Sequence, residues 1–133
     1  AVLTHGNIVA NILQATEWIS PSFEETNTSK DQEIIITPLQ LYHIFSLTAN
    51  CFTFSNIGAL NILITNPRDM NGFIKELKKW PFTAITGVNT LFNGLINNEG
   101  FKSVDFSHLR LALGGGMAVQ RPVAEKWMQV SNH

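Results

Sequence analysis

The sequence has few charged residues and a single cysteine. Charged side chains make up 14% of its 133 residues, whereas about 25% is usual in globular domains. A free-standing domain needs a charged surface, so we expect part of this surface to be covered by further protein. Cys51 alone excludes a disulfide framework and a zinc site built from several cysteines. A reducing, cytoplasmic location is therefore the expectation.

Several functional classes lack their characteristic residues. The net charge of −1 provides no basic surface for nucleic acid. There is no phosphate-binding GxxxxGK[ST] motif, no GxGxxG motif and no paired-carboxylate motif. The histidines are scattered without the spacing of metal ligands: His5, His43, His108 and His133. We therefore assign no catalytic residue and no metal ligand.

The run between Glu33 and Arg68 contains no charged residue, which raises the question of whether it spans a membrane. A spanning helix needs about 20 predominantly apolar residues. Here Pro38 and Gly58 interrupt the run, and its hydrophobic period changes partway along. The run therefore indicates a buried strand, a buried helix and a second buried strand, as parallel sheets require.

The whole chain follows an alternating helix and strand pattern. A first helix begins after the cap residue Thr4 and ends at Ser20-Pro21. Ile-rich or Leu-rich strands are predicted at 33–41, 59–65, 82–86 and 109–113, each followed by a helix. A further turn of helix is expected at 104–109. The prediction is one α/β unit over 1–133, a four-stranded parallel sheet flanked by helices (α-βα-βα-βα-βα); half of a (βα)₈ barrel is the alternative.

Unusual residues follow the strands, where ligands bind in open parallel sheets. The candidate binding residues from the first, third and fourth strands are Tyr42, His43, Phe45, Gly87, Val88, Thr90, Gly114, Gly115 and Gly116. They predict one wall of an apolar, mostly uncharged crevice. Their convergence at one edge is a stronger signal than any one of these motifs alone.

Several of these residues also have a purely structural interpretation. Three consecutive glycines favour the close approach of a ligand or of a neighbouring segment, but one glycine can simply serve a tight turn. His43 either lines the pocket and donates to an anion, or bonds a nearby carbonyl at the start of a buried helix. Asn89 and Thr90 are first of all candidate helix caps.

Five sequence blocks resemble one family, the bacterial long-chain fatty-acid–CoA ligases of the AMP-forming adenylating superfamily. In chain order the blocks are LTHGNIVAN, PLQLYHIFSLTANC, NILITNPRDMNGF, PFTAITGVNTLFNGLI and LRLALGGGMAVQ. Together they cover nearly the whole chain. The resemblance implies an internal fragment of the larger N-terminal adenylating domain.

That resemblance also implies a function. The parent enzyme would join a fatty acid to ATP, with magnesium, and pass the acyl group to CoA; it would be cytoplasmic, with peripheral contact at the inner membrane face. Tyr42, His43 and Phe45 would lie beside the acyl and phosphate site, Gly87, Val88 and Thr90 along the acyl channel, and Gly114–Gly116 against the adenylate.

The fragment alone is expected to be inactive, to hold no cofactor and to self-associate through its first helix or an edge strand. The alternative function is a self-sufficient ligand-binding or receiver-like α/β module. A receiver needs clustered acidic residues after its first strand, and TPLQLYH has none.

Overall fold

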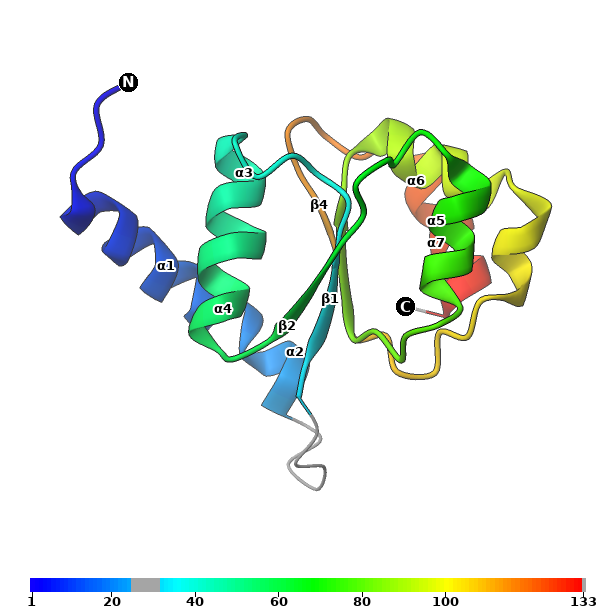
Figure 1. Ribbon diagram of the computed structural model, residues 1–133, viewed down its shortest axis with the longest axis horizontal. Coiled ribbons are helices and arrows are strands. Elements are labelled where there is room, and N and C mark those ends of the chain that lie inside the picture. The colour runs from blue at the N-terminus through cyan, green and yellow to red at the C-terminus, as the bar shows by residue number, and fades with distance from the viewer. Residues whose placement is uncertain (25–31, 133) are drawn as a thin grey trace.

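A four-stranded parallel sheet forms the centre of the structure, a computed structural model that describes residues 1–24 and 32–132 (Figure 1). Its strands are β1 (Ile34–Thr37), β2 (Leu60–Leu63), β3 (Ala84–Gly87) and β4 (Leu111–Gly114). Their order in the sheet is β2-β1-β3-β4, and every neighbouring pair is parallel. The predicted α/β fold is therefore confirmed.

The strand order excludes the barrel alternative. In a (βα)₈ barrel, strands that follow one another in the chain are also neighbours in the sheet. Here β2 and β3 lie on opposite sides of β1, so the winding direction reverses after β2. This is a doubly wound sheet, and β1 and β3 form its topological switch point.

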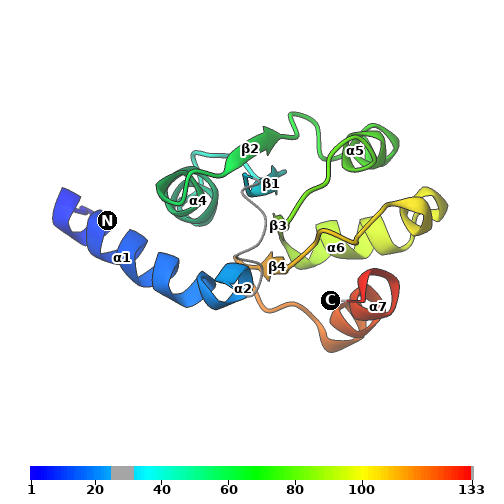
Figure 2. The same ribbon diagram turned by 90° about the horizontal axis from the view of Figure 1, so that it is seen from below.

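Helices cover both faces of the sheet (Figures 1 and 2). One face carries α1 (His5–Ile19), α2 (Pro21–Glu24) and the broken helix that follows β1. The other face carries the helices after β2, β3 and β4, which are α5 (Met70–Leu77), α6 (Asn89–Ile96) and α7 (Arg121–Ser131). Both faces of the two central strands are thereby buried, which explains the continuous isoleucine run of β1.

The helix predicted after the first strand is not a uniform α-helix. It consists of α3 (Ile44–Ser46), a seven-residue π-helix η1 (Leu47–Thr53) and α4 (Phe54–Asn56). The Phe54 N–H donates to the Ala49 carbonyl, five residues earlier, as in a π-turn. Gly58 then ends the helix at φ +76°.

Local capping rules fix several helix ends. Thr4 and Asn7 form a reciprocal capping box at the start of α1. Asp69 accepts from the Gly72 N–H at the start of α5, and Pro122 lies in the first turn of α7. The prediction of a helical turn at 104–109 is wrong: no helix forms there, and the 3₁₀ helix η2 (Glu99–Ser103), capped by Asn98, lies just before it.

The main hydrophobic core lies between the sheet and α5, α6 and α7. Phe92, Phe101 and Phe106 all contact the Trp127 ring, with centroid separations of 4.8, 5.4 and 6.1 Å. A smaller core around Ile19, Ile35 and Phe54 fills the other face.

Helix α1 contributes one buried residue to the core. Ile19 is its buried residue, while Val9, Leu13 and Trp18 are more than half exposed. Asn56 Nδ2 donates to Thr16 Oγ1 of this helix over 3.2 Å. Among the described residues, no helix is both long enough and apolar enough to cross a membrane.

Candidate functional site at the carboxyl edge of the sheet

A cleft of about 330 Å³ opens at the topological switch point. The loops that follow β1 and β2 contribute Pro38-Leu39-Gln40 and Pro67-Arg68, and Val88 and Thr90 line it from the start of α6. Because open α/β sheets bind ligands outside the carboxyl ends of strands where the order reverses, this cleft lies where a ligand is expected.

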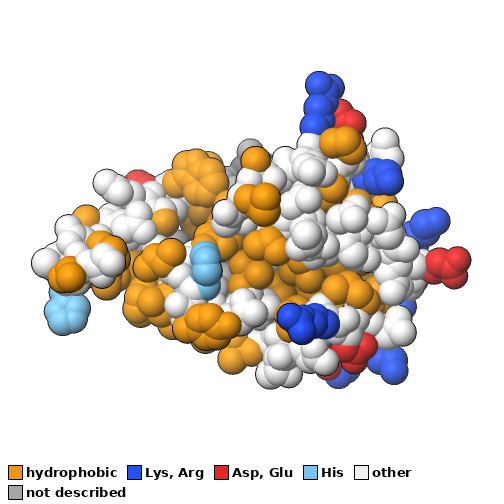
Figure 3. All heavy atoms as spheres, turned by 90° about the horizontal axis from the view of Figure 1, so that it is seen from above, with side chains coloured by type: hydrophobic (Ala, Val, Ile, Leu, Met, Phe, Trp, Pro, Cys, Tyr) orange, Lys and Arg blue, Asp and Glu red, His pale blue; other side chains and the backbone are white. Residues whose placement is uncertain are grey.

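The rim of this edge is apolar and almost uncharged. Figure 3 looks down on the edge and shows hydrophobic side chains across the face, with most charges at the end that carries α5, α6 and α7. Arg68 is the one charged residue among those that line the switch-point cleft. Within residues 1–24 and 32–132, no cluster of three His, Cys, Asp or Glu side chains is placed to hold a metal ion.

His43 caps the helix that follows β1. Its Nδ1 accepts a hydrogen bond from the Phe45 N–H over 3.2 Å. A neutral imidazole that accepts at Nδ1 carries its proton on Nε2. The side chain is exposed, so the Nε2–H remains available as a donor. The structural role is thus helix capping through an accepted N–H, where a bond to a carbonyl was predicted, and Nε2 faces away from that bond.

The aromatic neighbours of His43 differ from one another. Tyr42 is 87% exposed at the tip of the loop. Phe45 is half-buried, and its ring covers the backbone of Gly115, where an added Cβ would lie 2.5 Å from Cζ. The first helical turn after β1 and the loop after β4 therefore touch.

The glycine run is explained by contacts within the chain and by backbone conformation. An added Cβ on Gly114 would lie 2.3 Å from Val119 Cγ2, and Gly115 lies under Phe45. Gly116 has φ +80°, a conformation that favours glycine. The segment that comes close to these glycines is thus the protein itself, and adenylate contact with this run stays a prediction.

The residues after β3 pack tightly at the same edge. Gly87 is buried under the Phe92 ring, which an added Cβ would approach to 2.9 Å. Val88 is half-buried and lies beside Gly116. The capping prediction for Asn89 and Thr90 is wrong, because α6 begins after Val88 without a side-chain cap. Asn89 Oδ1 instead accepts from the Gln120 N–H, and Thr90 lines the cleft.

Sequence analysis missed a buried polar network below this edge. Asn50 of η1 is fully buried and joins hydroxyl groups of β1 and β3. In the sequence, Asn50 stands out only as an uncharged polar residue inside an apolar helix. Its partners come from strands that lie 13 and 36 residues away in the chain, and no local pattern brings them together.

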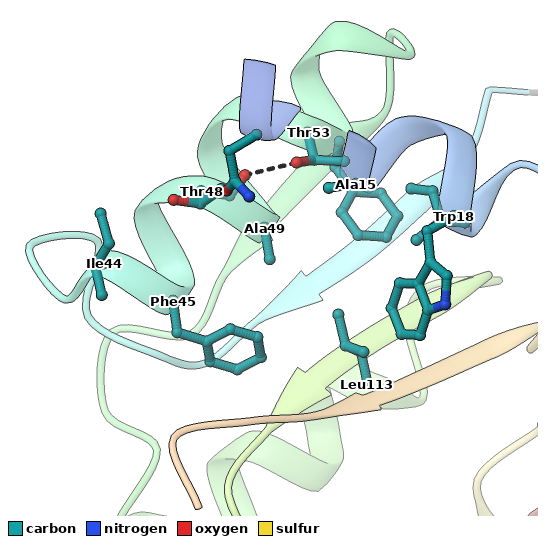
Figure 4. Close-up of a pocket in the computed structure, with 11 residues that line it drawn as sticks. Ala15, Trp18, Ile44, Phe45, Thr48, Ala49, Thr53 and Leu113 are labelled. Atoms are coloured by element: carbon teal, nitrogen blue, oxygen red, sulfur yellow. Dashed lines mark hydrogen bonds between the residues drawn. The ribbon is translucent and has the colours of Figure 1, made fainter. Parts of the chain in front are cut away.

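A second hollow lies between α1 and the broken helix, with a volume of about 330 Å³ (Figure 4). Its lining includes Trp18, Phe45 and Leu113, together with Ala15 and Ala49. The Thr53 hydroxyl that faces this region donates to the Thr48 carbonyl over 2.8 Å. The hollow is almost wholly apolar and contains no charged lining residue.

The two carboxyl groups whose pKa is lowered, Asp105 and Glu76, lie away from the carboxyl edge of the sheet. Hydrogen bonds from the Ser107 backbone and side chain lower the pKa of Asp105, which precedes β4. A hydrogen bond from Lys79 lowers the pKa of Glu76 in α5. Both carboxylates are solvent-exposed, so these shifts indicate surface hydrogen bonding.

The structure defines a doubly wound parallel α/β unit with a cleft at the carboxyl edge of its sheet. Comparison with known proteins gives the family, because the sequence signature of the AMP-binding enzymes matches residues 1–133. The chain belongs to this AMP-binding enzyme family.

Relatives of known function are similar over nearly the whole chain. It is 55% identical over 131 residues to the long-chain-fatty-acid–CoA ligase of Haemophilus influenzae, covering 98% of this chain and 23% of that protein. It is 54% identical over 127 residues to the ligase of the same description from Yersinia pestis, covering 96% and 22%. The chain therefore spans less than a quarter of the length of these relatives.

Solved structures share the fold at lower identity. Apo MatB from Rhodopseudomonas palustris matches all of this chain and 24% of its own, with a TM-score of 0.74 and 20% identity. The fatty acyl-adenylate ligase from L. pneumophila, solved in complex with acyl adenylate and pyrophosphate, matches 90% of this chain and 21% of its own, with a TM-score of 0.64 and 21% identity.

Proposed function

We propose that this chain forms part of the acyl- and adenylate-binding region of a long-chain fatty-acid–CoA ligase. The observation that carries the proposal is the 55% identity to the Haemophilus influenzae ligase across 98% of the chain. The match includes the loops at the carboxyl edge of the sheet. A self-sufficient receiver-like module is not favoured by a family match that extends over residues 1–133.

The reaction assigned to the parent enzyme has two steps. The fatty-acid carboxylate attacks the α-phosphorus of ATP, forming acyl-adenylate and releasing pyrophosphate. The CoA thiol then attacks the acyl carbonyl, forming the thioester and releasing AMP. Both steps develop charge on oxygen, and positioned hydrogen-bond donors stabilise such charge.

Residues of this chain fit a binding role in that reaction. The apolar rim suits an alkyl chain, and the free Nε2–H of His43 suits an anionic oxygen at the same edge. The described residues offer no carboxylate cluster for magnesium, so we derive no metal-dependent step from them. We expect the isolated chain to form no acyl-CoA, and a cytoplasmic location with inner-membrane contact remains part of the proposal.

Segment exchange tests the proposal directly. The 131-residue matching segment of the Haemophilus influenzae ligase is replaced by this chain, giving what we call the exchange ligase. We expect it to form acyl-CoA from oleate, ATP, magnesium and CoA, while the isolated chain releases no pyrophosphate above a protein-free blank. A folded exchange ligase without activity, or an active isolated chain, contradicts the proposal.

A further inference from the structure

Asn50 connects the two strands that form the switch point. Its Oδ1 accepts from Thr86 Oγ1 over 3.0 Å, and its Nδ2 donates to Thr37 Oγ1 over 2.9 Å. Thr37 is the last residue of β1, and Thr86 is the last but one of β3. All three side chains are at most 2% exposed. One amide therefore joins the bases of the loops after β1 and β3.

The same network includes β2 and the loop after β1. Thr37 Oγ1 donates to Asn61 Oδ1 over 2.7 Å, and Asn61 Nδ2 donates to the Asn50 carbonyl over 3.1 Å. The buried Ser46 hydroxyl lies 3.1 Å from the Leu39 carbonyl in that loop. The network thus joins the broken helix to β1, to the start of β2 and to the loop after β1.

The chemistry of the network favours a positioning role over simple packing. Packing alone could be achieved here by apolar side chains, with no amide or hydroxyl group removed from water. A buried polar network in which every group is hydrogen-bonded instead fixes one arrangement of the residues that form it. Asn50 also lies in the π-helix η1. Such π segments are rare and occur frequently at functional sites.

We propose that Asn50 is a positioning residue that sets the spacing of the loops after β1 and β3, and so the geometry of the switch-point cleft and of His43. The inference rests on the proposed function, because it assigns the cleft edge to acyl-adenylate formation. Asn50 itself is fully buried and acts through the loops that line the cleft.

Two threonines, Thr86 in β3 and Thr83 directly before it, provide a matched pair of variants. Thr86→Val removes the hydroxyl that donates to Asn50 at the carboxyl end of the strand. Thr83→Val removes a hydroxyl that bonds the Ile34 backbone at the amino end. Both residues are buried, and both hydroxyls link this segment to another element, so the two losses differ mainly in which end of the sheet they affect.

The variants are compared in the exchange ligase by steady-state pyrophosphate release, at a temperature where circular dichroism shows each one folded. A displacement of about 1 Å can cost on the order of 100-fold in rate. We expect Thr86→Val to lower kcat about tenfold or more with KM for oleate little changed. Thr83→Val should stay within about twofold, and Thr86→Ser, which keeps the hydroxyl, should restore most of the rate.

Equal kcat values for folded Thr86→Val and Thr83→Val would overturn the proposal and leave Asn50 with a role in stability alone. If Thr86→Val does not fold, Ser46→Ala replaces it, with the same expected fall in kcat and unchanged kcat again the contrary result. An inactive exchange ligase before any substitution contradicts the proposed function instead, so the two failures are distinguishable.

Discussion

Adding one methyl group at Gly115 tests the packing of the carboxyl edge. The Cβ of Gly115→Ala would lie 2.5 Å from Phe45 Cζ and 2.7 Å from two further ring carbons. Ordinary carbon contacts are about 3.5–4.0 Å, so the ring must retreat by about 1 Å. Overpacking of this kind costs about 1–3 kcal/mol. The half-buried ring borders the hollow beside α1, which gives it space to move and favours the lower half of that range.

For a domain of this size, about 1 kcal/mol lowers Tm by about 3–5 °C. We therefore expect Gly115→Ala to lower the Tm of the chain by about 3–10 °C in a circular dichroism melt. A shorter side chain in Phe45→Leu should remove most of that cost, giving a coupling of about 1 kcal/mol in the double-mutant cycle.

Gly94→Ala is the control. Its Cβ would meet Met70 at ordinary contact distances of 3.4–3.5 Å inside α6, so it should stabilise the helix by about 0.5–1 kcal/mol. If Gly115→Ala lowers the stability equally with Phe45 and with Phe45→Leu, the ring of Phe45 is not the reason for a glycine at position 115.

Four further outcomes are expected. His43→Ala should lower turnover of the exchange ligase far more than its Tm; a loss of folding with turnover per folded molecule intact supports the capping role alone. Arg110→Met should cost about 1–3 kcal/mol in a urea melt, because it leaves the partly buried Glu33 carboxylate without its partner at 2.9 Å; no loss contradicts this. The lowered pKa of Asp105 means that its contribution is present above the unfolded pKa and lost as pH falls through the folded pKa; Asp105→Asn should therefore flatten the pH dependence of stability below about pH 4, and an unchanged profile is the contrary result. The isolated chain should form a dimer or larger species in light scattering, because β2 and β4 are edge strands and apolar side chains are exposed on α1; a monomer at high concentration contradicts this.

Local rules were enough to predict the four strands and the main helices between them, but not the π-helix η1 or the 3₁₀ helix η2. The isoleucine run before Pro38 indicates a buried strand, and Thr4 marks the start of the first helix. Each signal lies within a few residues of the feature that it predicts. The parallel direction of the strands follows from the helices between them.

Strand order and the polar network depend on contacts between distant segments. Nothing near β2 shows that it pairs with β1 on the side away from β3. Asn50 has the composition of an ordinary helix residue until Thr37 and Thr86 are brought beside it. The glycine run indicated close approach, but Phe45, which makes that approach at Gly115, lies far earlier in the chain, in the segment after β1.

The most direct test of the central claim is the position of an acyl-adenylate in the exchange ligase. A crystal structure with a non-hydrolysable acyl-adenylate analogue shows which residues contact it. We expect the analogue at the carboxyl edge of this sheet, within contact distance of His43 and of the loops after β3 and β4. An analogue bound in an active exchange ligase with no contact to these loops would contradict the account.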